Sequence, residues 1–532
     1  MSATPLTGSP RQQYFDQSQA NGTIARVESD GDISSRRSSS GNLFEPNFVP
    51  PEHDRRTLVL CFDGTGDQFD ADNSNIVQFF SMLRKDNPQQ QLVYYQAGIG
   101  TYTIPQIATP AASRISKLVD EAIAKDLDAH VMGGYEFLMQ NYRAYDKICI
   151  FGFSRGAYTA RALAGMIHKV GLLPACNHQQ VPFAYKMFSR DDDEGWRQST
   201  AFKKAFSNDV EIEFLGVWDT VDSVGLIPRH LPFTQANNAI RYFRHALSLD
   251  ERRAKFRATY WQPWHGKRRG TKGGEMPVSN QTGAPIVHEH HAVHHPRTST
   301  GPEHAHGRKA RDEYLEHRYD IMNRNWATDV LEVWFAGDHC DVGGGNVKNG
   351  TRHCLARIPL RWMIRQCFLA GTGIQFHRSS FAGVGIDPKN LYPVVIPPKE
   401  PIAPTPELVQ HANIDAEIDQ KTEREEEEEI RDALCPASDA LASTLAWWIL
   451  EVIPLKMRVQ LRNSLRWTAR YMINLGHPRS VPMSNDEHQI VRVHRSVRLR
   501  EQAEGLKQGK YKPRAIFPFS KDGTKVEPTW VD

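Results

Sequence analysis

The stretch 147–158 constrains the fold more than any other part of this chain. It reads KICIFGFSRGAY, an apolar run that ends in Gly-x-Ser-x-Gly with Ser154 at its centre. Apolar residues at helical spacing follow from Tyr158 to Val170, so the pattern predicts a strand, a sharp turn and a helix. The two glycines let strand and helix approach closely, and the turn forces the serine into a strained conformation at a helix N-terminus. This context favours a nucleophilic serine over a structural turn.

Apolar runs of strand length alternate with helical patterns between residues 57 and 336. The apolar runs are 57–62, 92–95, 147–153, 210–218 and 331–336, and the helical patterns are 75–83 and 117–142. A continuous apolar run is typical of a strand that is buried on both faces. The alternation predicts the α/β fold class, with a mostly parallel central sheet and helices on both faces. In such sheets, functional sites gather at the C-terminal ends of the strands.

Three candidate catalytic residues each come just after a predicted strand. They occur in the order Ser154, Asp219, His339, which is the chain order of α/β-hydrolase triads. A serine hydroxyl is a poor nucleophile until a base takes its proton, and His339 can do this if a carboxylate orients its ring. Asp219 and Asp222 both qualify as that carboxylate. We favour Asp219, because it comes directly after the strand, and keep Asp222 as the alternative or as a supporting residue.

A tetrahedral oxyanion needs two hydrogen-bond donors. One predicted donor is the backbone N–H of Arg155, and the other comes from the first strand-end turn, at Gly64 or Thr65. Asp63 in that turn and Asp341 in the turn after His339 are candidates for supporting the site. For Asp63, a purely structural role in a tight turn is an equal alternative.

Composition excludes some classes of function. The 532 residues include 65 basic and 62 acidic side chains, a net charge of +3 that gives no general argument for nucleic acid. Seven scattered cysteines without a Cys-x-x-Cys pair indicate a reduced, intracellular protein. No signal pattern and no run of 18 apolar residues occurs, so we expect a cytoplasmic protein, with peripheral membrane contact left open. We expect no cofactor and no metal.

Composition also suggests the domain organisation. Residues 1–54 are polar and predict a disordered N-terminal tail, and 55–400 form the catalytic domain. Within it, 262–312 is a Gly- and His-rich insertion that we interpret as flexible rather than as a metal site, because no Cys or ordered carboxylate accompanies its histidines. Residues 401–430 are a Pro-rich and acidic linker, and 431–532 a basic, helical C-terminal extension.

Two stretches of this C-terminal part allow more than one interpretation. The acidic run Glu425–Glu429 predicts a solvated helix face or linker. The apolar stretch 441–455 predicts a helix that is too short to span a bilayer. Such a helix is usually core. The alternative is that Trp447 and Trp448 sit at a lipid surface, with basic residues further on meeting anionic head groups.

Six motifs occur together in a specific order. They are FDGT at 62–65, GIGT at 98–101, GFSRGA at 152–157, GVWDTV at 216–221, HALSLDERR at 245–253 and GDHCDVGGG at 337–345. As a set they resemble the uncharacterised α/β-hydrolase family that shares its catalytic domain with the bacterial type VI secretion phospholipase effectors. The resemblance covers about 57–375 apart from the insertion. The chain departs from it where the family often has Trp after the Thr of the first motif, and in its insertion and long tail, which look eukaryotic, fungal-like.

The resemblance implies lipase or phospholipase A chemistry, with the triad at Ser154, Asp219 and His339. We therefore expect a serine hydrolase that cleaves carboxylic esters of lipids through an acyl-serine intermediate. Two alternatives stay open from the residues: a hydrolase of soluble small esters or thioesters, and a non-catalytic scaffold that keeps the fold for binding. An intact triad argues against the scaffold, which has no need of all three residues.

Overall fold

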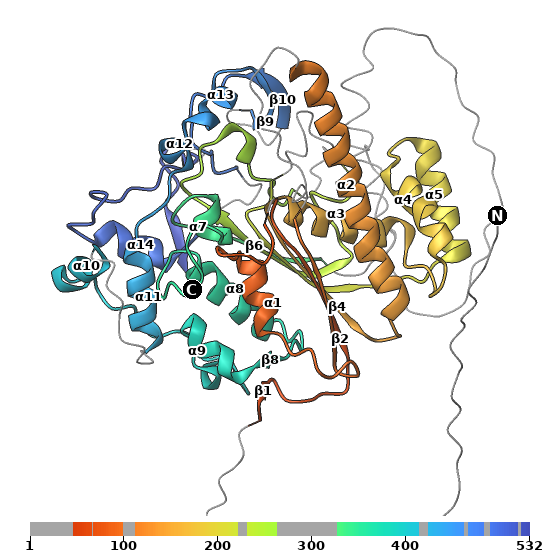
Figure 1. Ribbon diagram of the computed structural model, residues 1–532, viewed down its shortest axis with the longest axis horizontal. Helices are drawn as coiled ribbons and strands as arrows, with labels where there is room; N and C mark the ends of the chain where they lie inside the picture. Colours follow the sequence, from red (N-terminus) through yellow and green to blue (C-terminus); the bar gives the residue numbers. More distant parts are fainter. Residues whose placement is uncertain are drawn as a thin grey trace, which may run out of the picture. The chain divides into compact units, whose positions relative to one another are not determined.

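The computed structural model describes residues 46–65, 67–98, 112–221, 231–262, 327–413, 424–461, 467–483, 490–519 and 523–532 (Figure 1). All of these residues belong to one compact unit, Pro46–Asp532. For 112–126 only the helical backbone is described.

An eight-stranded sheet forms the centre of this unit. Its order is β12-β11-β7-β6-β5-β4-β2-β3, and every neighbouring pair is parallel. The strands are β2 (Thr57–Phe62), β3 (Gln91–Gln96), β4 (Lys147–Phe153), β5 (Ile212–Trp218), β6 (Ile240–Ser248), β7 (Asp329–Phe335), β11 (Val491–His494) and β12 (Pro528–Val531). The predicted α/β fold class, with its parallel central sheet, is confirmed.

Helices cover both faces of the sheet, because alternate strand residues point to opposite sides. Cys61 and Phe151 face one hydrophobic cluster, and Leu60 and Ile150 face the other. On the first side lie α1 (Asn75–Met82), α8 (Arg357–Leu369), α9 (Phe381–Val384) and α11 (Glu425–Leu434). On the second side lie α2 (Ala112–Asn141), α3 (Ser154–Val170), α4 (Val181–Ser189) and, packed on α3 and α4, α5 (Asp193–Phe206) (Figure 1).

Smaller elements complete the unit. They are β1 (Phe48–Val49) paired with β8 (Phe376–His377), the hairpin of β9 (Leu455–Gln460) and β10 (Trp467–Met472), α7 (His339–Gly343), α10 (Pro406–Asn413), α12 (Ala440–Ser443), α13 (Trp448–Glu451) and α14 (Arg495–Gln502). Short 3-10 turns occur at His178–Gln180, Ala254–Phe256, Arg378–Ser380, Pro388–Asn390 and Leu445–Trp447.

The C-terminal extension at 431–532 is less helical than the sequence predicted. It contributes four strands, and two of them, β11 and β12, extend the central sheet beyond β7. Val493 pairs with Trp334 of β7, and both side chains belong to one buried cluster. Val491 and Val493 are β-branched and suit a strand. The segment that contains β11 is therefore a strand because it pairs with the edge of β7.

The expectation of a solvated acidic run at Glu425–Glu429 was wrong. The run opens α11, where the Glu428 side chain and Asp432 one turn later are fully buried. Glu428 pairs with Arg352 and Arg357, and Asp432 pairs with Arg357 and Arg361. The arginines of α8 and the preceding loop draw these carboxylates inside, since a buried charge is stable only when it is paired.

The expectation of a single helix at 441–455 was also wrong. The stretch breaks into α12, a 3-10 turn and α13, and its last residue begins β9. Trp447 and Trp448 are half-buried. The Trp448 indole N–H donates to the carbonyl of Leu441, 3.1 Å away, within the same stretch. Among the described residues, no helix is long and apolar enough to cross a membrane.

Candidate active site

The turn between β4 and α3 holds Ser154 in the conformation that its motif predicts. Ser154 has a φ of +58°, in the left-handed region that costs a non-glycine residue about 1–2 kcal/mol. Gly152 and Gly156 are required for contact: a Cβ on Gly156 would lie 2.2 Å from the carbonyl oxygen of Asp63, and one on Gly152 would lie 2.5 Å from that of Gly156. The hydroxyl therefore stands at the N-terminus of α3, beyond the C-terminal end of β4.

Three side chains from three strand ends meet at this point. The Ser154 Oγ lies 2.8 Å from Nε2 of His339, and Nδ1 of His339 lies 2.5 Å from Oδ2 of Asp219. Asp219 follows β5, and His339 begins α7 after β7. All three residues are buried, with at most 4% of their surface exposed. The structure thus brings together the three residues chosen from the sequence, in the predicted order of contact.

Capping hydrogen bonds hold the start of α7, where His339 is the first residue. Asp338 caps this helix by accepting from the backbone N–H groups of Cys340 and Asp341, and the Asp341 carboxylate accepts in return from the N–H of Asp338. Ser438 donates its own N–H to Asp341, 2.7 Å away. Burial raises the pKa of both Asp338 and Asp341 above the usual range of a carboxyl group. Asp341 thus closes the helix cap, and its hydrogen-bond partners in the described structure are Asp338, Asn346 and Ser438 rather than the three central residues.

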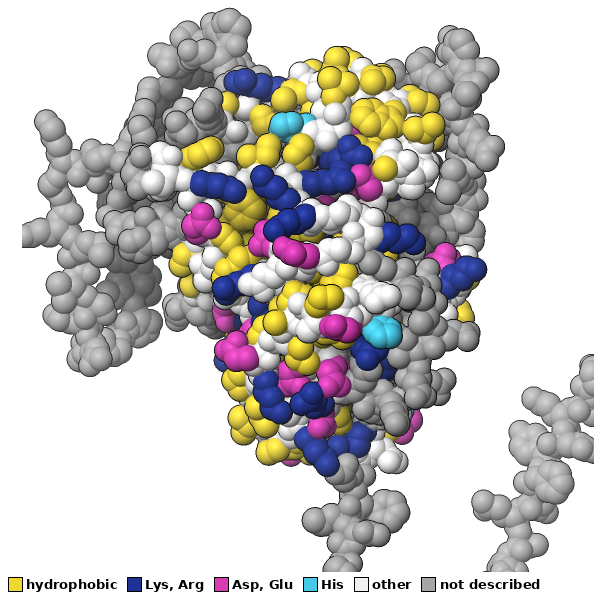
Figure 2. All heavy atoms as spheres, turned by 90° about the vertical axis from the view of Figure 1, so that its left-hand side faces the viewer, with side chains coloured by type: hydrophobic (Ala, Val, Ile, Leu, Met, Phe, Trp, Pro, Cys, Tyr) yellow, Lys and Arg dark blue, Asp and Glu magenta, His cyan; other side chains and the backbone are white. Residues whose placement is uncertain are grey.

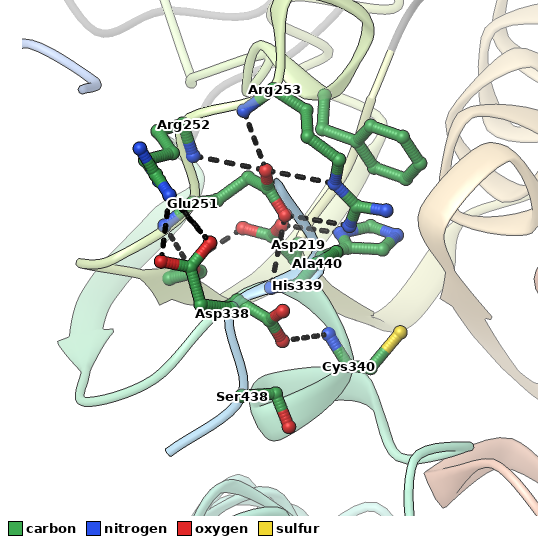
Figure 3. A network of polar contacts seen from close by, with 12 residues as sticks. Asp219, Glu251, Arg252, Arg253, Asp338, His339, Cys340, Ser438 and Ala440 are labelled. Atoms are coloured by element: carbon green, nitrogen blue, oxygen red, sulfur yellow. Dashed lines mark hydrogen bonds and ion pairs between the residues drawn. The ribbon is translucent and has the colours of Figure 1, made fainter. Parts of the chain in front are cut away.

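A second carboxylate, Glu251, holds the same loop from the other side. Its Oε2 accepts from the backbone N–H of His339 at 3.3 Å (Figure 3). Arg253 donates from Nε to Oε1 of Glu251 at 3.0 Å and from Nη2 to Oε2 at 2.7 Å. Phe256 packs edge-on against the His339 ring, with centroids 4.8 Å apart, and Phe153 packs on it at 4.7 Å. The imidazole is thus enclosed by aromatic rings and tied at its backbone.

Sequence reasoning missed the strongest partner of Asp219. Arg479 donates from Nη1 to Oδ1 at 2.6 Å and from Nη2 to Oδ2 at 2.8 Å, and only 2% of its side chain is exposed. Asp219 itself has a φ of +41°, and the N–H of Ser248 also donates to its Oδ1. Arg479 lies 260 residues further along the chain. No local pattern marks it, since a pairing at this separation leaves no spacing signal in one sequence.

These contacts set the charges of the site. Burial by itself would raise the pKa of Asp219, but the Arg479 guanidinium and the His339 ring hold it far below its usual range. Burial lowers the pKa of His339, and the hydrogen bond to Asp219 opposes that shift only in part. At neutral pH the ring is therefore uncharged and its Nε2 can accept a proton from Ser154.

The first strand-end turn holds the other predicted residues. The N–H of Gly64 donates to the Asp63 carboxylate at 2.8 Å, which also accepts from the hydroxyls of Ser74 and Tyr95. Asp63 therefore braces the turn, and the Gly64 amide is already engaged. The Thr65 hydroxyl is buried and has no hydrogen-bond partner among the described residues.

Arg155, Asp222 and the His-rich insertion are the remaining features predicted from the sequence. Arg155 is the second residue of α3, where backbone N–H groups have no partner within the helix. Asp222 lies outside the described residues, as does the His-rich insertion apart from Gln262. Within the described part of the chain, no group of three or more His, Cys, Asp or Glu side chains is arranged to hold a metal ion.

The parallel sheet, with its site at the strand ends, is that of an α/β-hydrolase-like fold. Residues 56–366 match the model of one family, "T6SS, Phospholipase effector Tle1-like, catalytic domain". The chain belongs to this family, and it is a lipase- or phospholipase-type hydrolase in that general sense. The matched range ends before Arg479, so the ion pair of Asp219 joins the family domain to sequence beyond it.

Individual relatives are more distant. The uncharacterized protein YEL023C of Saccharomyces cerevisiae is 26% identical over 551 residues, which cover 85% of this chain and 80% of the relative. An uncharacterized protein from Pseudomonas aeruginosa is 17% identical at a TM-score of 0.31, covering 60% of this chain and 46% of its own. The Tle1 effector bound to the VgrG spike of the Type 6 secretion system is 16% identical at 0.25, covering 59% and 56%. This chain thus spans about half the length of these two solved structures.

Proposed function

We propose that this protein is a serine hydrolase that cleaves carboxylic esters of lipids through an acyl-serine intermediate. One observation carries the proposal: Ser154 Oγ, His339 and Asp219 form a continuous hydrogen-bonded chain with distances of 2.8 and 2.5 Å. Geometry of this kind is what identifies a serine-hydrolase triad, whatever the sequence positions. The lipid part rests on the family, whose described catalytic domain is that of a phospholipase.

In the acylation step, Ser154 Oγ attacks the ester carbonyl carbon while its proton passes to Nε2 of His339. Asp219 holds the ring by Nδ1 and stabilises the imidazolium that forms. The tetrahedral intermediate collapses when the bond to the leaving alcohol breaks, and the proton on Nε2 goes to the departing oxygen. A water molecule then repeats the sequence on the acyl-serine and releases the fatty acid.

The negative oxygen of the tetrahedral intermediate needs donors that are free before the reaction. We assign this role to the backbone N–H of Arg155 and to Thr65, whose buried hydroxyl has no other partner among the described residues. Gly64, the third candidate, already gives its N–H to Asp63. We further propose that the enzyme is cytoplasmic, with peripheral membrane contact left open, because its seven cysteines are all free.

A fluorophosphonate probe tests the reaction class directly, since it labels only an activated serine. We expect labelling of the wild type, no labelling of Ser154→Ala, and unchanged labelling of Ser81→Ala, a control at an exposed position on α1. Thermal melting checks that the variants remain folded. Labelling that persists in folded Ser154→Ala, or hydrolysis lost on adding EDTA, would contradict the mechanism.

The substrate class is tested by comparing phosphatidylcholine vesicles with p-nitrophenyl butyrate and an acyl thioester. Release of fatty acid from the vesicles, absent in Ser154→Ala, supports a lipid substrate. Turnover of the small ester or thioester alone would replace the lipid by a soluble substrate. Absence of both turnover and labelling would leave a binding scaffold.

A further inference from the structure

The chain exposes a contiguous apolar surface next to the candidate active site, and we propose that this surface docks on a lipid membrane with anionic head groups. We name it the apolar face. It consists of Leu445, Ile449, Val452, Ile453, Tyr471, Met472, Ile473 and Leu475, each between 38% and 77% exposed. The proposal takes from the proposed function only the reason for docking, namely access to lipid, and the binding itself can be measured separately.

Eight exposed large hydrophobic residues within 31 positions are unusual for a soluble surface, because contiguous apolar patches mark interaction sites. They lie on and beside α13, from the preceding 3-10 turn to Ile453, and at the end of β10 and just after it, and α13 and the β9–β10 hairpin are neighbours in Figure 1. Figure 2 shows hydrophobic side chains gathered at the upper end of that side of the molecule, above a band of Lys and Arg.

The buried carboxylate of Glu451 joins the two segments of the apolar face. Its backbone oxygen accepts from the N–H of Leu475 at 3.0 Å, and its Oε2 accepts from the amide of Asn474 at 2.5 Å and from the N–H of Gly476 at 2.9 Å. Met472 pairs with Leu455 across the hairpin. The face is therefore held in place by buried hydrogen bonds.

The exposed charges on the two segments that carry the apolar face, 440–461 and 467–483, have one sign. Lys456 and Arg470 are exposed on the hairpin, and neither is paired with a carboxylate within the part of the chain that the structure describes. The only acidic residue in 440–461 and 467–483 is Glu451, of which 1% is exposed. An apolar surface bordered by unpaired cations fits an interface of acyl chains and anionic head groups.

The apolar face is also connected to the candidate active site. Trp447, between Leu445 and Ile449, packs edge-on against Phe256 with centroids 5.4 Å apart, and Phe256 packs against the His339 ring. Glu451 accepts from the N–H of Ala254 in the same loop, at 2.6 Å. A membrane on this face would lie beside the residues that cover Ser154 and His339. This position favours a lipid surface over a protein partner.

The test measures vesicle binding by the full chain carrying Ser154→Ala, so that no lipid is consumed. Vesicles contain either pure phosphatidylcholine or phosphatidylcholine with 30 mol% phosphatidylserine, a composition chosen for the experiment. We expect cosedimentation with the anionic vesicles, and a loss of at least about 30-fold in partitioning when Leu445, Ile449 and Leu475 are all changed to Ser.

A matched control changes three exposed hydrophobic residues on other elements to Ser, namely Phe183, Phe206 and Leu369. It should bind as strongly as the parent. Because all six positions are more than half exposed, neither triple variant should lower the melting temperature appreciably. Equal binding by both triple variants overturns the proposal. A wild-type dimer that dissociates in the first variant, with vesicle binding unchanged, also overturns it and makes the face a contact between copies.

A separate double variant tests how much the positive charges contribute to vesicle binding. Lys456→Glu with Arg470→Glu should abolish the preference for phosphatidylserine and leave weak binding to pure phosphatidylcholine. In the Ser154-containing parent, hydrolysis of p-nitrophenyl butyrate should be unchanged by either set of surface variants. If Ser154 proves inert to the fluorophosphonate probe and the vesicle results hold, the docking surface stands while the proposed function fails.

Discussion

The strand ends of β2 to β7 and the segment after residue 400, which we call the later segment, contribute to the same site in different ways. The strand ends supply Ser154, Asp219 and His339, each placed by a local pattern of apolar run and turn. The later segment supplies Arg479, which neutralises Asp219 from 260 residues away. The reacting groups thus lie within the family domain, and part of their electrostatic environment lies outside it.

The same contrast holds for buried charge in general. Glu428, Asp432 and Glu451 all lie in the later segment and are all buried. Glu428 and Asp432 form ion pairs with arginines at 352–361, and the Glu451 carboxylate accepts a hydrogen bond from the N–H of Ala254. The later segment is therefore bound to the catalytic part through charged and polar contacts in the interior.

The largest effect should come from the strand ends alone. Ser154→Ala and His339→Ala should each lower kcat by about 10⁴–10⁶-fold, and the double variant should be no slower than either, because such residues act as a unit. Steady-state kinetics on phosphatidylcholine vesicles and on p-nitrophenyl butyrate measure this. Multiplicative losses in the double variant would mean that the two residues do not share one step.

Removing the contribution of the later segment should cost less activity and more stability. Arg479→Met leaves the buried Asp219 carboxylate without its cation, so the free energy of unfolding should fall by about 3–5 kcal/mol. Arg498→Met, at an exposed position on α14, is the matched control and should change little. Urea unfolding of both variants gives the comparison.

The pairing itself can be isolated by a double-mutant cycle. In Arg479→Met with Asp219→Asn, neither charge is left unpaired, so the double variant should be more stable than the sum of the single losses allows. Additive losses would show that Arg479 acts through its bonds to the backbone oxygens of Ser248 and Phe256 instead.

Sequence patterns could predict the strand ends because chemistry and local structure coincide there. Close contacts require glycine at Gly152 near the end of β4 and at Gly156 near the start of α3, and Asp219 and His339 come just after apolar runs. No local sequence pattern marks the buried contacts of the later segment. Glu428 reads as part of a solvated acidic run, and only the fold shows that Arg357 meets it from α8. In addition, a break in the helix pattern at 441–455 is fixed by tertiary contacts that no periodicity encodes.

Adjacent residues of that acidic run offer a narrower test. Glu428→Gln removes a buried charge that balances Arg352 and Arg357, and we expect the free energy of unfolding to fall by roughly 3 kcal/mol. Glu427→Gln, one position earlier, removes only a partly exposed pair with Arg424 and should lie within experimental error. Chemical unfolding of the two variants decides it. Equal, small effects would restore the interpretation of a solvated run.

The smallest effect concerns pH and connects the two regions through one proton. The base His339 must be neutral to act, so kcat/KM should rise with pH through the pKa of His339, which burial lowers below its ordinary value of 6.5. We expect Arg479 to contribute to this, because its positive charge offsets the charge of Asp219, which by itself favours the imidazolium. In Arg479→Met the pKa of His339 should therefore rise, and the acid limb of the kcat/KM profile should move to higher pH by on the order of one unit. Arg479→Lys keeps the charge and should return the limb close to its original position, even if the loss of bidentate geometry lowers kcat. A loss of structure alone would lower the whole profile without moving its limb. An unmoved limb in a folded Arg479→Met protein would therefore mean that the later segment supports the site mechanically and does not set its charge.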